Sequence, residues 1–430
     1  DQINEIRHLV SGKNLQILTS TGEFYLRPPV SQPVTPTGIR IVNQSTFGTQ
    51  LKAKPRQFDN ATVFVQNNGK TIREYLFSES AEEYSSHSIS LLSSHIIDTP
   101  VDTAKLTSVP ERTEQFYFLV NSDGTMAIFL SQRNEKIAGW MQWNTDGNFT
   151  SICATTTDLY AATTRTINSA TVYTLEQFAD QAFDLPTDFT VSKTISGSYQ
   201  PHGSPLTNGS FSSTTTFIAD GFTNAPSIGE TFQFAGSGTV FTINSVTATG
   251  NSNEYTIVID TASSQSDGVA LQFVTSKVFN DIATHRGKVV HGTSGSNETS
   301  AVYYYGSGTV SSGGVVTFDV PTSAVDIGLD FTTEIDTFSV DALATQGQIT
   351  GIPRRIGKIV LELSSTYNVQ VNANDVVLTT ASINTSDGLD GFTGKKEVYV
   401  LGYSLEPNLE IRQSAPLPMR LLGVTTEVYF

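Results

Sequence analysis

The sequence has one cysteine, Cys153, among 430 residues. A single thiol cannot close a disulfide within the chain, so the disulfide-stapled scaffolds of small secreted domains are excluded and the redox compartment stays open. Because Cys153 lies in an apolar strand pattern, the sequence predicts that it is a small buried hydrophobic residue. The chain also lacks a run of 18 apolar residues and a secretory signal peptide. We therefore expect no membrane span.

Positive charge is scarce as well. Lys and Arg number 25 against 41 Asp and Glu, for a formal net charge of −16. Such a balance disfavours adhesion to phosphate backbones and to membrane surfaces. It remains compatible with DNA that passes through a channel without specific binding, where weak adhesion is useful.

Helix-forming residues are sparse, whereas Ser, Thr, Gly, Asn and Val are abundant, and this bias favours strands and turns. Only the segments 78–88 and 174–182 have short helix-like patterns. With 38% hydrophobic and 10% aromatic residues, the chain can bury real cores. We predict an all-β protein.

The best-formed part of the pattern covers residues 114–178. Runs of five to eight apolar, aromatic and β-branched residues are each closed by turn formers, among them Asp123-Gly124 and Asp146-Gly147. Asp-Gly between two such runs is a strong hairpin signal, since glycine readily supplies the positive φ of tight turns. Short strands joined this tightly predict an antiparallel meander, and repeated meanders are typical of an irregular β-propeller. An ordinary stack of β-sheets is the alternative that this cadence leaves open.

Changes in composition divide the chain into four parts. Residues 1–183 are expected to form the propeller-like platform, and 184–216, rich in Ser, Thr, Gly and Pro, a linker or extended arm. Short alternating strands around glycine turns predict an inserted small β-barrel over 217–280, and 281–430 is expected to be a β-sandwich. The chain opens directly into a strand pattern without an initiator Met, so we expect its true N-terminus to lie upstream.

The sequence contains no recognisable catalytic, cofactor-binding or metal-binding motif. The six histidines form no metal-ligand spacing, although His285 and His291 flank one strand and would share a face. His202 precedes Ser204, but no nucleophile elbow surrounds that serine. We therefore predict that the protein is not an enzyme and uses no cofactor.

Two acidic patterns have structural explanations. Asp123 and Asp146 superficially resemble the Asp-box turns of sialidases, yet both lack the aromatic residue of that motif, so hairpin turns explain them better. Asp387 and Asp390 lie among glycines and could offer oxygen ligands to Ca²⁺, but the EF-hand spacing is missing and a polar loop is the default.

Two tryptophans, Trp140 and Trp143, lie three apart in one predicted strand. Successive strand residues alternate between faces, so the two rings are expected on opposite faces. We predict that one belongs to a core and that the other is a candidate interface aromatic.

Several segments taken together resemble one family, the tail nozzle or tail hub proteins of short-tailed bacteriophages, also called tail tubular protein B-like or stabilisation proteins. The stretch from Met126 to Phe178 is similar to their propeller segment. The segments HRGKVVHG, PRRIGKIVLELSSTYNVQV and SLEPNLEIRQSAPLPMRLLGVTTEV are similar to their later segments, in the same order. The resemblance is collinear and covers most of the chain.

The resemblance implies a structural virion protein of the phage tail. It implies a hexameric ring that extends the DNA-ejection channel below a tail adaptor ring and holds tail fibres or spikes on its outer surface. The predicted barrel interrupts the family pattern. It faintly resembles the small barrel of the first catalytic-cysteine half-domain of ubiquitin-activating enzymes, from which no chemistry is carried over. The rival function is that of a carbohydrate-binding or polysaccharide-degrading tail adhesin, which would need an aromatic groove and paired carboxylates.

Overall fold

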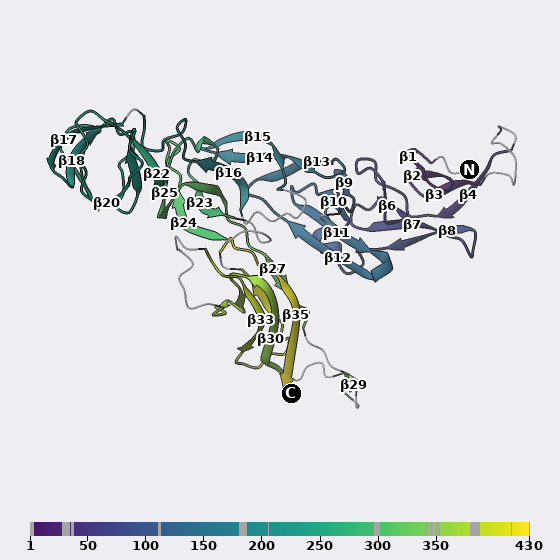
Figure 1. Cartoon of the computed structure of the whole chain (residues 1–430). Coiled ribbons are helices and arrows are strands. Elements are labelled where there is room, and N and C mark those ends of the chain that lie inside the picture. Colours follow the sequence, from purple (N-terminus) through teal and green to yellow (C-terminus); the bar gives the residue numbers. More distant parts are fainter. Residues whose placement is uncertain are drawn as a thin grey trace. The chain divides into compact units, whose positions relative to one another are not determined.

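The computed structural model confirms the all-β class (Figure 1). It describes residues 4–27, 35, 38–110, 113–179, 187–204, 206–295, 302–339, 343–344, 347–348, 353–378, 388–413 and 415–429. The helices of this described part are three single turns, namely η1 (Ser94–Ile96), η2 (Arg133–Glu135) and η3 (Ala283–His285). The chain divides into two compact units, Asp1–Phe183 and Asp184–Phe430.

In its described residues, the first unit consists of four antiparallel sheets that follow one another along the chain. Sheet 1 contains β1 (Ile6–Ser11), β2 (Leu15–Thr19), β3 (Glu23–Arg27) and β4 (Arg40–Ser45). Sheet 2 contains β5 (Arg56–Phe58), β6 (Ala61–Val65), β7 (Ile72–Ser78) and β8 (Glu83–Ser88). Sheet 3 contains β9 (Asp102–Leu106), β10 (Phe116–Val120), β11 (Met126–Gln132) and β12 (Ile137–Trp143). Sheet 4 contains β13 (Asn148–Ala154), β14 (Leu159–Ile167) and β15 (Ala170–Gln177).

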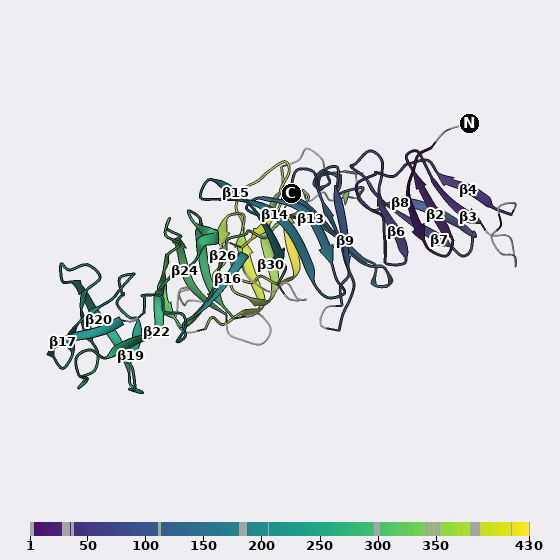
Figure 2. The ribbon, with the colours of Figure 1, turned by 90° about the horizontal axis from the view of Figure 1, so that it is seen from above.

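These sheets are stacked face to face, with a hydrophobic core between each neighbouring pair (Figure 2). The strand β6 reads ATVFV and is buried at every position, which is expected of a strand covered on both faces. Its Phe64 packs into the core shared with sheet 1, whereas Val63 and Val65 pack into the core shared with sheet 3. In β10, Tyr117 faces sheet 2 and Phe118 faces sheet 4 by the same alternation.

The two Asp-Gly turns have different roles. Asp123-Gly124 closes the hairpin between β10 and β11 as predicted, with Val120 paired to Met126 and Gly124 at φ 87°. Asp146-Gly147 does not close a hairpin, because β12 belongs to sheet 3 and β13 to sheet 4. It carries the chain from one sheet to the next.

The two short helix predictions are wrong over their described residues. Segment 78–88 supplies the end of β7 and all of β8, and the segment that begins at Thr174 supplies the second half of β15.

The second unit contains a closed six-stranded barrel. Its strands are β17 (Leu206–Ser213), β18 (Thr216–Asp220), β19 (Thr231–Phe234), β20 (Val240–Ala248), β21 (Tyr255–Ile259) and β22 (Ala270–Phe279). The order is β17-β18-β21-β20-β19-β22, and pairing of β17 with β22 closes it. The interior is filled by aromatic and aliphatic side chains, among them Phe217, Phe222, Phe232, Phe234, Phe241 and Phe273.

The barrel begins earlier than the predicted 217–280, and the predicted linker over 184–216 is wrong for two of its stretches. Within it, β16 (Asp188–Thr194) pairs with β26 (Ala324–Leu329), and β17 pairs with β18 and β22. The Ser- and Thr-rich composition suggested a linker, yet alternation still buries Leu206 and Asn208.

The described region after the barrel contains two larger hydrophobic cores and a smaller cluster around Val302, Leu389 and Leu417, where one sandwich over 281–430 was predicted. The first core lies around the sheet β16-β26-β23-β24 and the strand β25, where β23 is Val289–Ser294, β24 is Tyr303–Thr309 and β25 is Val316–Thr322. The C-terminal part of β22, from Ser276 to Phe279, extends beyond the barrel and pairs with β25. One strand therefore serves both the barrel and this core.

The second core lies between two further sheets. One has the order β33-β30-β35, with β33 (Phe392–Tyr399), β30 (Arg355–Thr366) and β35 (Leu421–Tyr429). The other has the order β27-β34-β31-β32, with β27 (Glu334–Asp336), β34 (Glu410–Arg412), β31 (Gln370–Val371) and β32 (Asn374–Asp375). A small pair, β28 (Leu343–Ala344) and β29 (Gly347–Gln348), stands apart from both.

Candidate functional site: a buried polar network at the base of the barrel

The two candidate tryptophans lie on opposite faces of β12 and are half-buried. Trp140 packs on Phe129, with ring centroids 4.8 Å apart, and its Nε1 donates to the backbone oxygen of Ile89 at 2.8 Å. Trp143 stacks on Phe178 at 5.4 Å. Each ring therefore belongs to an internal core of the sheet stack, one on either side of sheet 3.

The predicted histidine pair has separate partners. His285 is buried, with Nε2 2.7 Å from the backbone oxygen of Phe189, whereas His291 Nδ1 lies 2.8 Å from the hydroxyl of Tyr304. Burial lowers the pKa of His291, although the charge of Asp330 opposes this.

Of the two carboxylates considered for Ca²⁺, Asp390 is among the described residues and Asp387 lies outside them. A different acidic cluster was missed by the sequence analysis: Glu334, Asp336 and Glu410 place carboxylate oxygens within 4.8 Å of one another. Arg412 lies among them, with Nη2 3.1 Å from Glu334 and in contact with Glu410. Arg412 therefore pairs with two of the three carboxylates, Glu334 and Glu410.

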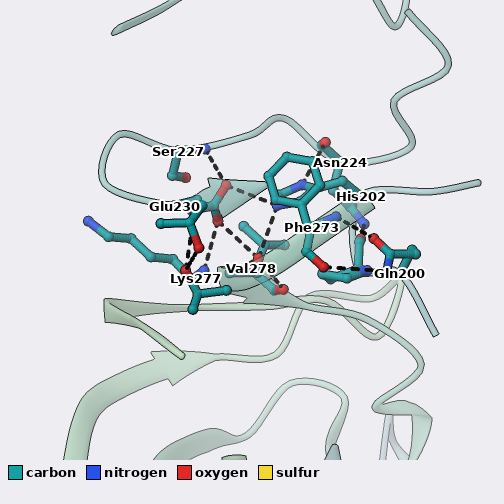
Figure 3. A network of polar contacts seen from close by, with 12 residues as sticks. Gln200, His202, Asn224, Ser227, Glu230, Phe273, Lys277 and Val278 are labelled. Atoms are coloured by element: carbon teal, nitrogen blue, oxygen red, sulfur yellow. Dashed lines mark hydrogen bonds and ion pairs between the residues drawn. The ribbon is translucent and has the colours of Figure 1, made fainter. Parts of the chain in front are cut away.

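The most concentrated polar chemistry lies where the barrel meets the preceding segment (Figure 3). His202 comes from the turn before β17, Glu230 immediately precedes β19, and Ser276 lies on β22. The Nε2 atom of His202 is 3.0 Å from Glu230 Oε2 and 3.0 Å from Ser276 Oγ, and Ser276 Oγ donates to Glu230 Oε1 at 2.9 Å. All three residues are 0% exposed.

The Glu230 carboxylate is fully hydrogen-bonded despite its burial. In addition to His202 and Ser276, the backbone N–H groups of Ser227 and Lys277 donate to it, each at 2.7 Å. Burial by itself raises the pKa of Glu230, but the hydrogen bond and charge of His202 and the two backbone donors outweigh it and lower that pKa. The carboxylate is therefore held ionised.

Both nitrogens of the His202 imidazole have polar partners. Its Nδ1 lies 3.1 Å from the backbone oxygen of Asn224, which can only accept, so Nδ1 is the donor in that hydrogen bond. Its Nε2 faces the buried carboxylate of Glu230 at 3.0 Å. The ring also packs on Phe273, with centroids 4.2 Å apart.

A serine, a histidine and a glutamate in contact invite comparison with a hydrolase triad, but the geometry is different. In a triad the carboxylate holds one imidazole nitrogen and the serine uses the other. Here Glu230 and Ser276 share Nε2, Nδ1 is occupied by a backbone carbonyl, and no solvent reaches the hydroxyl. This arrangement can fasten segments together, but it cannot present a nucleophile to a substrate.

Amide side chains extend the network along the segment before the barrel. Gln200 pairs with the backbone of Phe273, accepting from its N–H at 2.8 Å, and Asn280 donates to the backbone oxygen of Pro201 at 3.0 Å. Asn224 donates to the same oxygen at 2.8 Å. The network therefore joins the incoming chain, the loop before β19, and β22 at the point where that strand leaves the barrel.

An ion pair between a buried arginine and a half-buried glutamate fixes sheet 4. Arg165 on β14 holds Glu176 on β15 through two hydrogen bonds of 2.6 Å each, and it also donates to the backbone oxygen of Asp146 at 3.0 Å. Burial raises the pKa of Glu176, but its hydrogen bonds to Arg165 and neighbouring threonines have the larger combined effect and lower that pKa. The pair anchors the crossing from sheet 3 to sheet 4.

Sequence reasoning noticed His202 but not its partners. Ser276 lies 74 positions away, so no local spacing links the residues of the network. Glu230 lies beside a predicted strand like many other acidic residues, and nothing in the neighbouring sequence indicates that it is buried.

Among the described residues, no helix has the length and apolar character needed to span a membrane. The search against protein-family models returned no match, and the search of curated proteins returned none either.

Proposed function

We propose that this protein is a structural subunit of a ring, the tail nozzle or hub of a short-tailed bacteriophage, whose channel passes DNA and whose outer surface docks fibres or spikes. The observation that carries the proposal is the sheet stack of the first unit. Its inner sheets are covered on both faces, whereas both end sheets present apolar side chains to solvent.

At one end, the outward face of sheet 1 is almost entirely apolar. Strand pairing places Leu9, Ile17, Phe24 and Asn43 in one row across β1, β2, β3 and β4. A second row places Leu26 beside Ile41. Leu9 is 62% exposed and Ile41 55% exposed.

At the other end, Tyr173 and Leu175 on β15 are 79% and 77% exposed. Stacked repeat proteins need terminal units with polar outer faces to remain soluble as single molecules. Contiguous exposed apolar patches mark interaction surfaces. These ends therefore favour a protein that continues its stack with neighbouring subunits.

The charge of the chain agrees with a conduit. A net charge of −16 repels the DNA backbone, so a channel lined by such subunits would let DNA slide without retaining it. The best-formed constellation of titratable groups, around His202 and Glu230, is sealed from solvent and serves structure.

Native mass determination of the purified protein, with negative-stain images, tests the proposal. We expect a six-membered ring with a central hole at high protein concentration. A closed trimer, or a monomer at every concentration up to the solubility limit, would contradict it.

One observation favours a second candidate, a carbohydrate-binding tail adhesin. Tyr399, Tyr403 and Tyr429 at the sheet of β30 are 67%, 59% and 43% exposed, and Arg355 stacks on the latter two. Exposed aromatic rings are common platforms for ligands with apolar faces. For an adhesin, at least one member of a panel of host oligosaccharides should raise the melting temperature of the protein. A ligand that binds only the folded state stabilises that state. No shift with any of them would remove this candidate.

A further inference from the structure

We infer that sheets 1 and 2 of the first unit are joined through buried water molecules, which are bound by a layer of polar side chains between the two sheets. This layer lies inside one subunit, so its occupancy does not depend on the proposed ring.

Two facing sheet surfaces supply the polar side chains (Figure 2). On sheet 1, Gln16 of β2 and Tyr25 of β3 are paired neighbours, and Tyr25 packs into the core shared with sheet 2. On sheet 2, Tyr75 of β7 packs into the same core and is paired with Ser86 of β8. Ser88 lies two residues further along β8 and therefore points to the same side as Ser86. These five polar side chains line one inter-sheet layer.

Each of the five side chains has a buried polar atom without a hydrogen-bond partner within the protein, namely Gln16 Oε1, Tyr25 Oη, Tyr75 Oη, Ser86 Oγ and Ser88 Oγ. Gln16 is 3% exposed, and the two tyrosines are 1% exposed each. A buried polar group without any partner is unfavourable, and native interiors satisfy such groups with ordered water where the protein offers no partner. The atoms are therefore placed to bind internal water.

The other two cores of the stack differ in character. Among the described residues, the core between sheets 2 and 3 and the core between sheets 3 and 4 bury ten hydrophobic residues each. The core between sheets 1 and 2 buries five, and three of these are tyrosines, Tyr25, Tyr75 and Tyr84. This layer is therefore the most polar of the three.

The chemistry of the unpartnered atoms selects water as the occupant. Gln16 Oε1 can only accept a hydrogen bond, whereas burial raises the pKa of Tyr75, so the Tyr75 hydroxyl keeps a proton to donate. The buried carboxylate of Glu23 lies on the same face of sheet 1, but it accepts from the Ser45 hydroxyl and the backbone N–H of Phe47. A metal ion could satisfy the acceptors but could not accept the hydroxyl protons. Water both donates and accepts.

Removal of the hydroxyls tests this assignment by the sign of the effect. Tyr25→Phe and Tyr75→Phe each delete one hydroxyl and keep the ring. Where the hydroxyl binds water, its loss lowers the equilibrium constant for folding; where it is dry, the substitution removes an unsatisfied group and leaves that constant unchanged or raises it. Urea unfolding is followed by tryptophan fluorescence, which reports the first unit alone because both tryptophans of the chain lie on β12. Tyr173→Phe is the matched control, since the Tyr173 side chain is 79% exposed.

We expect Tyr25→Phe and Tyr75→Phe each to lower the folding equilibrium constant of the first unit about fivefold. The control should change it less than about twofold. An unchanged or raised constant in either buried variant would overturn the inference. A crystal structure of the protein should in addition show water oxygen atoms at hydrogen-bonding distance from Tyr25 Oη and Tyr75 Oη. Hydroxyls that meet only apolar atoms there, or that bond directly to another protein group, would overturn it as well.

Discussion

The barrel and the sheet stack are built from the same kind of short antiparallel strand but finish in opposite ways. The barrel pairs its first strand, β17, with its last, β22, and so encloses a phenylalanine core with no open edge or face. The stack buries a core between each neighbouring pair of sheets and leaves an apolar face at either end. The barrel is complete within one chain, whereas the end sheets of the stack offer apolar surface to a neighbouring subunit in the assembly proposed above.

The largest expected effect is a loss of stability in the second unit when the buried network at the base of the barrel is changed. Glu230→Gln replaces a buried carboxylate that accepts four hydrogen bonds and turns an amide N–H toward the donors of Ser227 or Lys277. Leaving a buried donor without an acceptor costs about 1–3 kcal/mol, and more where the lost hydrogen bond was to a charged group. Thermal and urea unfolding should show this loss in the second unit, with the first unit unchanged.

The matched control is Asp267→Asn, which removes an equal charge from an exposed position of the barrel region. It should change stability by no more than about 0.5 kcal/mol. Equal effects of the two substitutions would mean that the buried network contributes little.

Acid should weaken the same site. The folded pKa of Glu230 lies below its ordinary value of 4.5, so its stabilising effect is complete above pH 4.5 and is lost as pH falls through the lowered pKa. The melting temperature of the second unit should drop below pH 4.5, and this drop should be smaller in Glu230→Gln. Glu176, whose pKa is also lowered, gives the first unit a dependence of the same sign. A melting temperature that rose on acidification would contradict both assignments.

A smaller effect separates assembly from folding. Leu9→Lys and Leu175→Glu each place a charge on one end of the stack, at side chains that are 62% and 77% exposed. We expect each to weaken self-association at least tenfold, about 1.4 kcal/mol, while the melting temperature of the dissociated protein is unchanged.

Leu91→Lys is the control for that pair, since Leu91 is 77% exposed but lies outside both end faces. If Leu91→Lys weakened self-association as strongly as Leu9→Lys, the end faces would have no particular role in assembly.

The smallest effect concerns Trp140. Trp140→Phe keeps an aromatic ring against Phe129 but deletes the N–H that donates to the backbone oxygen of Ile89. Loss of one half-buried hydrogen bond should lower the stability of the first unit by about 1 kcal/mol. An assembly defect without such a loss would return Trp140 to the role of an interface residue.

The sequence predicted the all-β class well, because alternation and turn chemistry are local. It predicted the hairpin at Asp123-Gly124 but misread Asp146-Gly147, since the same dipeptide serves a crossing between sheets when its flanking strands pair elsewhere. The sheet stack, the alternative left open beside the propeller, describes the four meanders of the first unit.

The prediction that Cys153 is buried is wrong because of one irregularity in the strand β13. An unbroken strand would put Phe149, Ser151 and Cys153 on one face, and the burial of Phe149 would then bury the thiol. A bulge between Phe149 and Ser151 shifts the phase, so Ile152 points into the core and Cys153 is exposed.

The segment beginning at Thr174 was misjudged for a related reason. Leu, Glu and Gln favour helices, but Glu176 faces inward to the buried Arg165 while Leu175 faces out. Tertiary pairing overrides the local preference. The network around His202 could not be predicted, since Glu230 and Ser276 lie 46 positions apart and Ser276 lies 74 positions from His202.

The position of the barrel within the chain has a consequence for the order of folding. Ser192 on β16 meets Asp326 on β26 across 134 positions of sequence, and the whole barrel lies between them. Each doubling of the length of a loop adds about 0.6 kcal/mol to the free-energy cost of closing it. The pairing of β16 with β26 is therefore slow to form while the intervening chain is unfolded. A barrel that folds first brings its two ends together and shortens that loop. Pulsed hydrogen exchange during refolding should therefore protect β18 to β21 before β16 and β26, and the reverse order would show that the insertion folds on a scaffold already made.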